Sequence, residues 1–558
     1  MRFSILWTPL ALTAIASGQV TPFDEYGTLP SSRFGSNVSV VTRVPAFPGE
    51  QPEEMLAVAS QFGASRIDIW KLDRVANQWN IERSFNPMHT NPPGSRFGAS
   101  IALFAEESAN GLEFFGVIGE SRGAVGVDPT AGRAFRINAS NSGGGTIFPS
   151  ITGSGTDRLG KSAVLGDMNG DGALDAIIGS PNLGSASPSG SPGRVDVYDL
   201  STNPTPLLIA TIGGPTPSSE FGASVAFLGN GRFVVGAPNA GPLNDGAIYI
   251  YGGQPIQLET TITSVSTALG QTLGAMGDVN GDGVNDFYAG EPLAFPNGRI
   301  HVRSGVDGAI LATISSTGGQ GPSLGSKVAG GKDLDGDRIA DLVVPSTSSS
   351  GLVTAYSGAT GALIGTIPRA PSDTLPVSSL ALIDAEGLYR NQVAIGQRDA
   401  TSPIGDVSAG RVRILSVPIP FGNPYCSQLA GSESSVGGFP SVVASGSVSA
   451  STNGLILTTT GLPANSFATH YAGSQPDFFR LTLGGPSTRC FGGMNGAFGF
   501  VSTGPSGSIT TAVDLDSVPG LGMVSAGSTI YLQCGYRDTT PTGFVFKMTS
   551  ALEVLLTN

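Results

Sequence analysis

An acidic loop that occurs three times constrains the fold of this 558-residue chain more than any other sequence feature. The ligand positions of its first copy are Asp167, Asn169, Asp171, Ala173 and Asp175. Ca²⁺ takes about six to eight oxygen ligands. Short acidic side chains on a tightly turned backbone supply several of them, and a carbonyl near Ala173 adds one more. The spacing therefore predicts a calcium-binding loop.

The same pattern returns twice, each time before a short apolar run that is typical of a buried strand. The second copy comprises Asp278, Asn280, Asp282, Val284 and Asp286, and the third comprises Asp333, Asp335, Asp337, Ile339 and Asp341. A solvated turn is also rich in Asp, Asn and Gly, but turn propensity does not explain matching oxygens in three copies. Carboxylates so close together would repel each other without a cation. We therefore expect up to three Ca²⁺ ions, each stabilising a hairpin.

The composition favours an all-β protein and argues against nucleic acid as a partner. The chain has 81 Gly and 39 Pro with 40% hydrophobic residues, which indicates many short strands joined by tight turns. Its 42 acidic and 29 basic residues give a net charge of -13, and the sequence contains no basic cluster. After the first 19 residues, no segment is apolar for long enough to cross a bilayer.

A repeat with a spacing of 51 to 63 residues divides most of the chain. Its mark is an aromatic residue or Leu followed by Gly, and the marks stand at Phe34, Phe97, Leu159, Phe221, Leu273 and Leu324. Each mark precedes apolar or alternating segments with Gly-rich turns between them, so we expect four strands per repeat. Four strands at this period are typical of a propeller blade. A degraded repeat near Ser379 brings the expected number of blades to seven.

In three repeats the acidic loop follows the mark. Two of these loops precede a Gly-x-Pro turn, as at Gly179-Ser180-Pro181, and after the third loop the turn is weakened to Val344-Pro345. This order resembles the FG-GAP repeats of integrin α-subunit propellers and of many secreted bacterial proteins. The resemblance covers about residues 30–415 and implies a seven-bladed β-propeller with Ca²⁺ in blade hairpins. It also implies a domain that binds proteins or glycans without doing chemistry. The first, second and fourth repeats lack the loop, and Arg338 replaces a glycine of the pattern in the third loop.

We expect four segments along the chain. Residues 1–19 carry a basic residue, an apolar run and small residues, which predicts a secretory signal peptide and a secreted or surface location. Residues 20–416 form the propeller, residues 417–424 a proline-spaced linker, and residues 425–558 a β-sandwich that resembles a C-terminal module of secreted bacterial proteins. Cys426, Cys490 and Cys534 allow one disulfide, for which we favour Cys426 with Cys490, and leave one thiol over.

Motifs that could carry catalysis are weak. Residues 155–162 match a phosphate-binding loop, yet the repeat register places Lys161 at an ordinary strand position. Two Gly-x-Ser-x-Gly matches are expected by chance in a chain so rich in Gly and Ser. The histidines, His89, His301 and His470, are scattered over different units.

The sequence thus predicts a secreted, non-catalytic recognition or adhesion protein that binds Ca²⁺ and an extracellular protein or glycan. One alternative is a polysaccharide lyase or hydrolase with its site at the propeller's central mouth, because carboxylate pairs assembled by folding are invisible in sequence. Another is a spacer in a surface layer, which would lack a saturable ligand.

Overall fold

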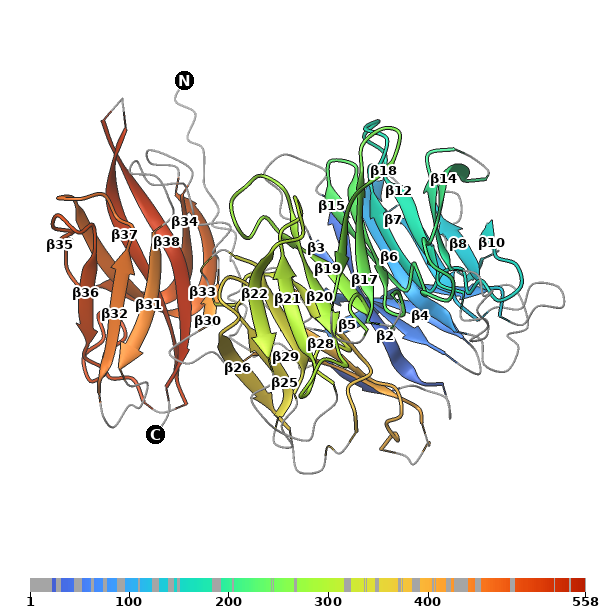
Figure 1. The fold of residues 1–558 in the computed structure, drawn as a ribbon. Helices are drawn as coiled ribbons and strands as arrows, with labels where there is room; N and C mark the ends of the chain where they lie inside the picture. The colour runs from blue at the N-terminus through green and yellow to red at the C-terminus, as the bar shows by residue number, and fades with distance from the viewer. Residues whose placement is uncertain are drawn as a thin grey trace, which may run out of the picture.

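The computed structural model describes residues 23–26, 32–44, 53–61, 65–73, 78–87, 96–108, 111–122, 130–138, 145–147, 151–182, 192–202, 205–241, 243, 245–264, 268–315, 323–335, 337, 339–346, 351–369, 373, 375–383, 392–403, 406, 408–417, 423–425, 440–446, 453–481, 487–525, 527–540 and 543–556. Every element of regular secondary structure in these residues is a β-strand (Figure 1). The predicted signal peptide and most of the predicted linker lie outside the described residues.

The described residues up to Ser416 form seven four-stranded units, or blades, in which neighbouring strands are antiparallel. Blades 1 to 3 comprise β2 (Phe34–Val44), β3 (Glu53–Ser60), β4 (Arg66–Asp73) and β5 (Gln78–Pro87); β6 (Phe97–Ser108), β7 (Gly111–Glu120), β8 (Arg133–Ile137) and β10 (Ile151–Thr152); and β11 (Ser162–Gly166), β12 (Asp175–Ser180), β13 (Arg194–Asp199) and β14 (Leu207–Gly213). Blades 4 and 5 comprise β15 (Ser224–Gly229), β16 (Arg232–Ala237), β17 (Ala247–Gly252) and β18 (Gln257–Thr263); and β19 (Thr272–Gly277), β20 (Asp286–Glu291), β21 (Arg299–Arg303) and β22 (Ile310–Ser315). Blades 6 and 7 comprise β23 (Ala329–Lys332), β24 (Asp341–Pro345), β25 (Gly351–Tyr356) and β26 (Leu363–Pro368); and β27 (Ser379–Ile383), β28 (Gln392–Gln397), β29 (Arg411–Ser416) and β1 (Asp24–Tyr26).

Blades 1 and 2 differ from the others because their innermost strands are longer. β2 has 11 residues and β6 has 12, whereas the innermost strands of blades 3 to 7 have 4 to 6. The extra length lets residues 42–44 pair in parallel with residues 104–106, and β9 (Gly145–Ile147) pairs in parallel with β5. The two blades therefore share one nine-stranded sheet.

The blades form a closed ring. Each innermost strand contacts the innermost strand of the next blade, and β27 of blade 7 contacts β2 of blade 1. β1 completes blade 7 by pairing with β29, where Asp24 lies opposite Arg413 and accepts a hydrogen bond from Arg411 at 2.6 Å. No motif in the sequence predicts this link between the start and the end of the ring. The prediction of an all-β propeller is confirmed.

Two glycines of the repeat meet at the junctions between blades: the glycine of the mark, and the glycine near the end of the second strand of the preceding blade. Gly222, in the mark of blade 4, has a φ of +89°, a backbone region that glycine adopts readily and other residues rarely do. A Cβ on Gly179 of blade 3 would lie 2.1 Å from the carbonyl oxygen of Gly222. A Cβ on Gly290 of blade 5 would likewise lie 2.1 Å from the carbonyl oxygen of Gly325 of blade 6. Glycine is therefore needed at both motifs because two backbones touch there.

The structure corrects the predicted mark of blade 5. The sequence pattern placed it at Leu273-Gly274, but Leu273 lies inside β19. Leu269 instead makes the parallel bridge to Gly246 of blade 4, as the marks of neighbouring blades do. Leu-Gly occurs at both places, and only the pairing between blades distinguishes them.

A ring of side-chain hydrogen bonds also joins the blades. The donor is a Ser or Thr hydroxyl that lies opposite the glycine near the end of the second strand, and the acceptor is the mark's glycine carbonyl in the next blade. The pairs are Ser100 with Gly160 (3.0 Å), Ser162 with Gly222 (2.9 Å), Ser224 with Gly270 (2.7 Å), Thr272 with Gly325 (2.7 Å) and Ser379 with Gly35 (3.0 Å). In blade 1 the side-chain amide of Asn37 donates to the carbonyl of Gly98 in blade 2 at 3.0 Å. In blade 6 this position holds Lys327.

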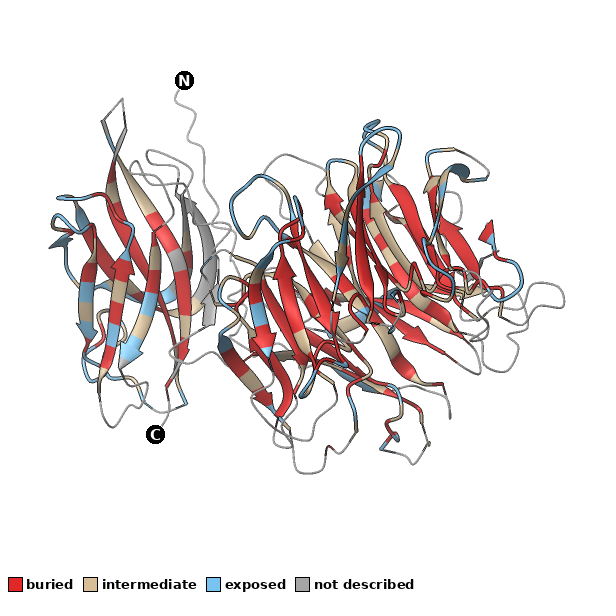
Figure 2. Cartoon of the chain, viewed as in Figure 1, coloured by how far each residue is buried: buried red, intermediate tan, exposed pale blue. Residues whose placement is uncertain are grey.

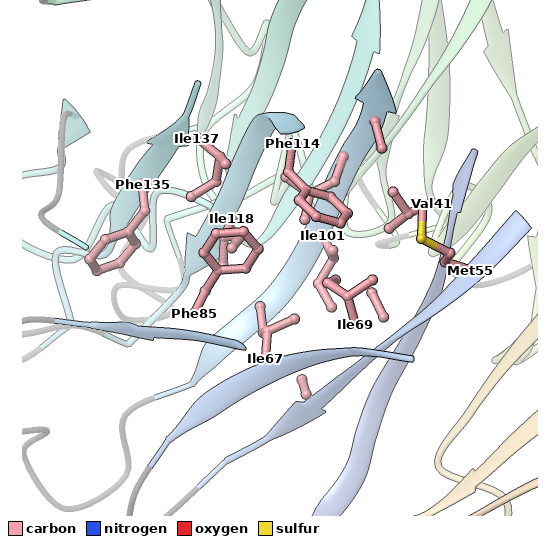
Figure 3. Close-up of a cluster of buried hydrophobic side chains, with 14 of the residues drawn as sticks. Val41, Met55, Ile67, Ile69, Phe85, Ile101, Phe114, Ile118, Phe135 and Ile137 are labelled. Carbon is pink, nitrogen blue, oxygen red and sulfur yellow. The ribbon is translucent and has the colours of Figure 1, made fainter. Parts of the chain in front are cut away.

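The hydrophobic core lies between blades. A cluster of buried hydrophobic side chains fills every junction around the ring. Figure 2 shows the resulting burial along the strands, and Figure 3 shows the cluster that Phe85, Phe114 and their neighbours form between blades 1 and 2. In this cluster Phe97 is fully buried and meets Phe135 edge to face at 5.1 Å. The marks thus supply core side chains as well as backbone contacts.

The strands after the propeller form two sheets, drawn orange to red in Figure 1. The larger sheet contains β30 (Asn423–Tyr425), β38 (Gly543–Leu555), β37 (Thr529–Thr540), β33 (Phe467–Leu481), β34 (Ser487–Ala497) and β35 (Val501–Ser502), and the smaller contains β31 (Ser441–Gly446), β32 (Leu455–Thr460) and β36 (Ile509–Val513). Leu457 and Val513 of the smaller sheet share a core with Leu532 and Val554 of the larger.

Two cysteines of this region are described. Cys490 is disulfide-bonded, and Cys534 is a buried free thiol. The predicted partner of Cys490, Cys426, lies outside the described residues. No helix in the described part of the chain is long and apolar enough to span a membrane.

Candidate calcium-binding loops

Each acidic loop connects the innermost strand of its blade to the second strand. The loops lie between β11 and β12, between β19 and β20, and between β23 and β24. The last Asp of each loop begins the second strand and is fully buried, at Asp175, Asp286 and Asp341. One oxygen of each carboxylate accepts a hydrogen bond from a loop amide, at 2.8, 2.8 and 2.6 Å respectively. The start of the second strand therefore directs a buried carboxylate at each loop.

The first Asp of the loop closes the turn. The amides of Gly170 and Gly172 donate to the two carboxylate oxygens of Asp167 at 2.6 and 2.9 Å. Asp278 accepts the equivalent pair of bonds in the second loop at 2.7 and 2.8 Å. Gly170 and Gly172 have φ values of +77° and +86°, which explains the glycines between the acidic residues.

The middle residues of each loop form successive side-chain to backbone turns. Asn169 accepts from the amide of Asp171 at 2.9 Å, and Asp171 accepts from the amide of Ala173 at 2.7 Å. The second loop repeats both bonds at 3.0 and 2.9 Å. In the third loop, Asp337 accepts from the amide of Ile339 at 2.8 Å. Short polar side chains make such local bonds readily, so the loop shape follows from nearby sequence.

The third loop brings three acids to one point. Carboxylate oxygens of Asp333, Asp335 and Asp341 all lie within 4.8 Å of one another, close enough for a single ion to touch all three. The donors are oxygens, which suits a hard cation such as Ca²⁺. Arg338, which replaces the glycine of the other two loops, lies outside the described residues.

Negative charge crowds these loops. Burial raises the pKa of Asp175 to about 6, and the neighbouring Asp199 adds to the rise. Burial, and then Asp335, raise the pKa of Asp341 to about 8. A bound cation would offset the repulsion and keep these carboxylates ionised. The electrostatics of the loops therefore fit a metal ion.

The first loop has an acidic neighbour, Asp199, that lies outside the predicted loop pattern. Asp199 of β13 lies directly opposite Asp175 in the sheet. In the other two loops the amides of Gly305 and Gly358 donate to the second oxygen of the buried Asp at 2.9 Å. Leu200 stands at the equivalent place in blade 3, and Asp175 Oδ1 has no hydrogen-bond partner in the described part of the chain. A buried oxygen without a donor fits direct contact with a cation. An alignment of the third strands of the blades would have revealed both Asp199 and the replacement of the glycine by Leu200.

A cavity of about 810 Å³ lies beside the first loop. Ala173 of the loop lines it together with Phe104 and Phe115, whose rings stack at 5.3 Å. In its wall, Arg136 donates to the carbonyl of Leu200 at 2.6 Å. Because the loop forms one side of the cavity, an ion that orders the loop would also shape the cavity.

The match to a phosphate-binding loop has no helix after it. Ser162, its last residue, begins β11 and donates its hydroxyl to the carbonyl of Gly222 at 2.9 Å. The residue therefore serves the junction between blades 3 and 4. The prediction that no helix follows this match agrees with the structure, but Lys161 itself lies just before β11 and not at a strand position.

The two described histidines are buried in strands, and His89 lies outside the described residues. His301 Nδ1 lies 3.0 Å from the hydroxyl of Thr313. His470 Nε2 and Nδ1 lie 2.8 and 2.7 Å from the hydroxyls of Thr459 and Thr511, which belong to the other C-terminal sheet. Burial lowers the pKa of His470 to about 4. His470 therefore joins the two sheets as a neutral side chain.

Acidification is expected to destabilise the C-terminal sheets through His470. An unfolded histidine titrates near pH 6.5, whereas His470 stays neutral until about pH 4, so the unfolded state binds more protons between these values. This contribution to stability is complete above about pH 6.5 and falls by up to about 1.4 kcal/mol per pH unit below it. Urea unfolding at several pH values, compared with His470→Gln, measures the effect. Identical pH slopes in the two proteins would contradict it.

Curated proteins of similar sequence include integrin α chains and a phospholipase. The chain is 30% identical to integrin alpha-PS2 of Drosophila melanogaster over 224 residues, which are 34% of this chain and 15% of that protein. It is 32% identical to integrin alpha-5 of Xenopus laevis over 176 residues, 29% of this chain and 15% of that protein. It is 34% identical to phosphatidylinositol-glycan-specific phospholipase D of Homo sapiens over 198 residues, 30% of this chain and 21% of that protein.

The chain thus spans about a fifth or less of the length of these relatives. No family model matches it. The similarity to integrin α chains and the all-β fold together confirm the resemblance to an FG-GAP propeller.

Proposed function

We propose that this chain is a secreted, calcium-binding recognition or adhesion protein whose propeller binds an extracellular protein or glycan without catalysing a reaction. The observation that carries the proposal is the recurrence of an oxygen-rich loop at one place in blades 3, 5 and 6, each with a buried carboxylate directed at it. Similarity to two integrin α chains supports a recognition role for the propeller.

Ca²⁺ would have a structural role in this proposal. Each loop joins two strands of a single blade, so an ion in it would hold the hairpin together and preserve the surface that the blade presents. The backbone carbonyls of Ala173, Val284 and Ile339 would complete the ligand sets that the side chains begin.

Asp171→Ala is expected to remove one bound ion and to leave the other two in place, because the three loops belong to separate blades. Equilibrium dialysis with radioactive calcium counts the ions per chain. Asp307→Ala serves as a matched control, since Asp307 lies in an exposed turn of blade 5 outside the loops. Loss of all three ions from Asp171→Ala would contradict independent sites.

A binding screen tests the recognition role. The purified protein is applied to arrays of glycans and extracellular proteins with calcium and with a chelator, beside a variant in which Asp171, Asp282 and Asp337 are all replaced by Ala. Saturable binding that needs both calcium and intact loops is expected. If no saturable ligand is found under either condition, the spacer alternative replaces the proposal.

An enzyme is the second candidate function, because one relative is named as a phosphatidylinositol-glycan-specific phospholipase D. The alternative from sequence was a polysaccharide lyase or hydrolase. Incubation with a glycosylphosphatidylinositol substrate and with a panel of polysaccharides tests both activities. Turnover of either substrate by the purified chain would overturn the non-catalytic proposal.

A further inference from the structure

Positive charge gathers at one end of the propeller axis, although the chain has a net charge of -13. A cavity of about 350 Å³ lies there, lined by residues from blades 1, 2, 3, 5, 6 and 7. We call this cavity the central mouth and define it by its four charged lining residues, Arg96, Lys161, Lys327 and Arg398. No acidic residue is among the described residues that line it. The four cations come from four blades, so the sequence shows no basic run.

Among the described residues, two of the four cations, Arg96 and Lys327, have no acidic partner, and Glu220 acts on Lys161 only through space. Within the described ranges, Arg96, Lys161 and Lys327 form no ion pair, and Arg398 lies 3.3 Å from Asp399. The other end of the same innermost strands is different, because Lys332 donates to both carboxylate oxygens of Glu54 at 2.5 and 2.6 Å. Lys332 is thus neutralised within the fold, whereas the four cations of the central mouth outnumber the two acidic residues, Asp399 and Glu220, that act on them.

The cations of the central mouth also repel one another. Burial, and then neighbouring arginines, lower the pKa of Arg96. Burial, and then Arg96, lower the pKa of Lys161, and burial followed by Arg398 does the same for Lys327. Folding therefore brings like charges together at a cost in stability, which a bound anion would offset.

The repeat indicates that the fold does not need either lysine. Lys327 stands where five other blades have a Ser or Thr hydroxyl that bonds to the next blade. Lys161 follows the glycine of its mark, where blades 2 and 4 have Ala99 and Ala223. Both lysines replace small residues of the repeat and add charge at the central mouth. An excess of positive charge in a concave site is typical of a ligand-binding site.

We propose that the central mouth binds the carboxylate or sulfate group of an acidic sugar residue in a glycan ligand. Arg and Lys bind such oxyanions through charge-assisted hydrogen bonds. The other lining residues are mostly small polar ones, including Ser36, Asn37 and Gln61, which can bond to sugar hydroxyls. A cavity of about 350 Å³ is at the small end of ligand sites, which favours one sugar group over the surface of a folded partner. This inference rests on the proposed recognition function and names the ligand class.

Calorimetric titration with a defined acidic oligosaccharide tests the inference. The probe is a glucuronate-containing hyaluronan hexasaccharide; maltohexaose, free glucuronate and a hexaglutamate peptide are compared with it, all in calcium. We expect the hexasaccharide to bind, with affinity that falls as salt is raised, and maltohexaose not to bind. Lys161→Ala with Lys327→Ser is expected to raise the Kd about tenfold or more.

The double variant uses the residues that other blades carry at the same positions, so it is expected to fold, which its melting temperature checks. Lys71→Ser with Arg232→Ser is the matched control, because it also removes two positive charges and neither residue lines the central mouth. Binding lost in the first variant and kept in the second supports the inference, and binding of free glucuronate as well places the anion itself in the site. Equal affinity for hexaglutamate would replace the glycan with an acidic peptide.

Equal loss of affinity in both variants, or no binding of any anionic probe by the unmodified protein, would overturn the inference. Either result would leave the proposed recognition function itself untouched, and the array screen distinguishes the two failures. If the array screen finds a neutral saturable ligand while the anionic probes do not bind, recognition stands and only the anionic site is lost.

Discussion

Removing divalent cations with a chelator is expected to lower the free energy of unfolding of the propeller by about 4–8 kcal/mol relative to about 10 mM Ca²⁺. Extracellular calcium modules have dissociation constants of about 10⁻⁴ to 10⁻³ M. At this concentration, an ion bound only by the folded state adds about 1.4–2.7 kcal/mol per site, and three sites act together. Thermal unfolding at several calcium concentrations measures the effect.

The variant with Asp171, Asp282 and Asp337 replaced by Ala provides the control for this result. It keeps the buried Asp175, Asp286 and Asp341 that begin the second strands, so the strands can still form. Its melting temperature is expected to respond little to calcium or chelator. If the unmodified protein melts at the same temperature with and without calcium, the loops do not stabilise the folded state through an ion.

Replacing Phe97 by Ala is expected to reduce the free energy of unfolding by about 3–5 kcal/mol. Phe97 is fully buried in the cluster between blades 1 and 2 and meets Phe135 edge to face at 5.1 Å. Removing its ring leaves a cavity that a close-packed junction fills only in part. Urea unfolding followed by circular dichroism measures the loss.

Phe97→Leu is the matched control, because blades 3, 5 and 6 carry Leu159, Leu269 and Leu324 at the same place in the repeat. A change that keeps a large apolar side chain is expected to cost less than about 1.5 kcal/mol. If the Ala and Leu variants lose equal stability, the ring of Phe97 does not support the junction as its contacts indicate.

The acidic loops could be predicted because they depend on short-range contacts. Asp167 bonds to amides three and five residues away, and Asp171 bonds to the amide of Ala173. Contacts of this kind recur wherever the same residues recur at the same spacing, so three copies in the sequence became three similar loops. The strand period and the turn glycines were equally local, which explains why the all-β class followed from sequence.

Contacts between distant segments were harder to foresee. The choice between Leu269 and Leu273 as the mark of blade 5 depends on pairing with blade 4. Asp199 comes close to the first loop only because β13 pairs with β12. The residues beside Leu269 do not distinguish it from Leu273, and Asp199 stands out only when the third strands of several blades are aligned. Register between strands is set by the whole buried face, which a local pattern does not contain.

The sequence by itself determined the repeated strands, the glycine motifs and the oxygen-rich loops, because each depends on residues that are neighbours along the chain. Only the tertiary structure decided that β1 completes blade 7 through β29, and that Lys161 and Lys327 from different blades line one cavity. The physical reason is ring closure. It places the first strand of the chain beside the last blade, and it gathers the starts of all the innermost strands around one axis. Charges that are far apart in the sequence therefore lie close together in space.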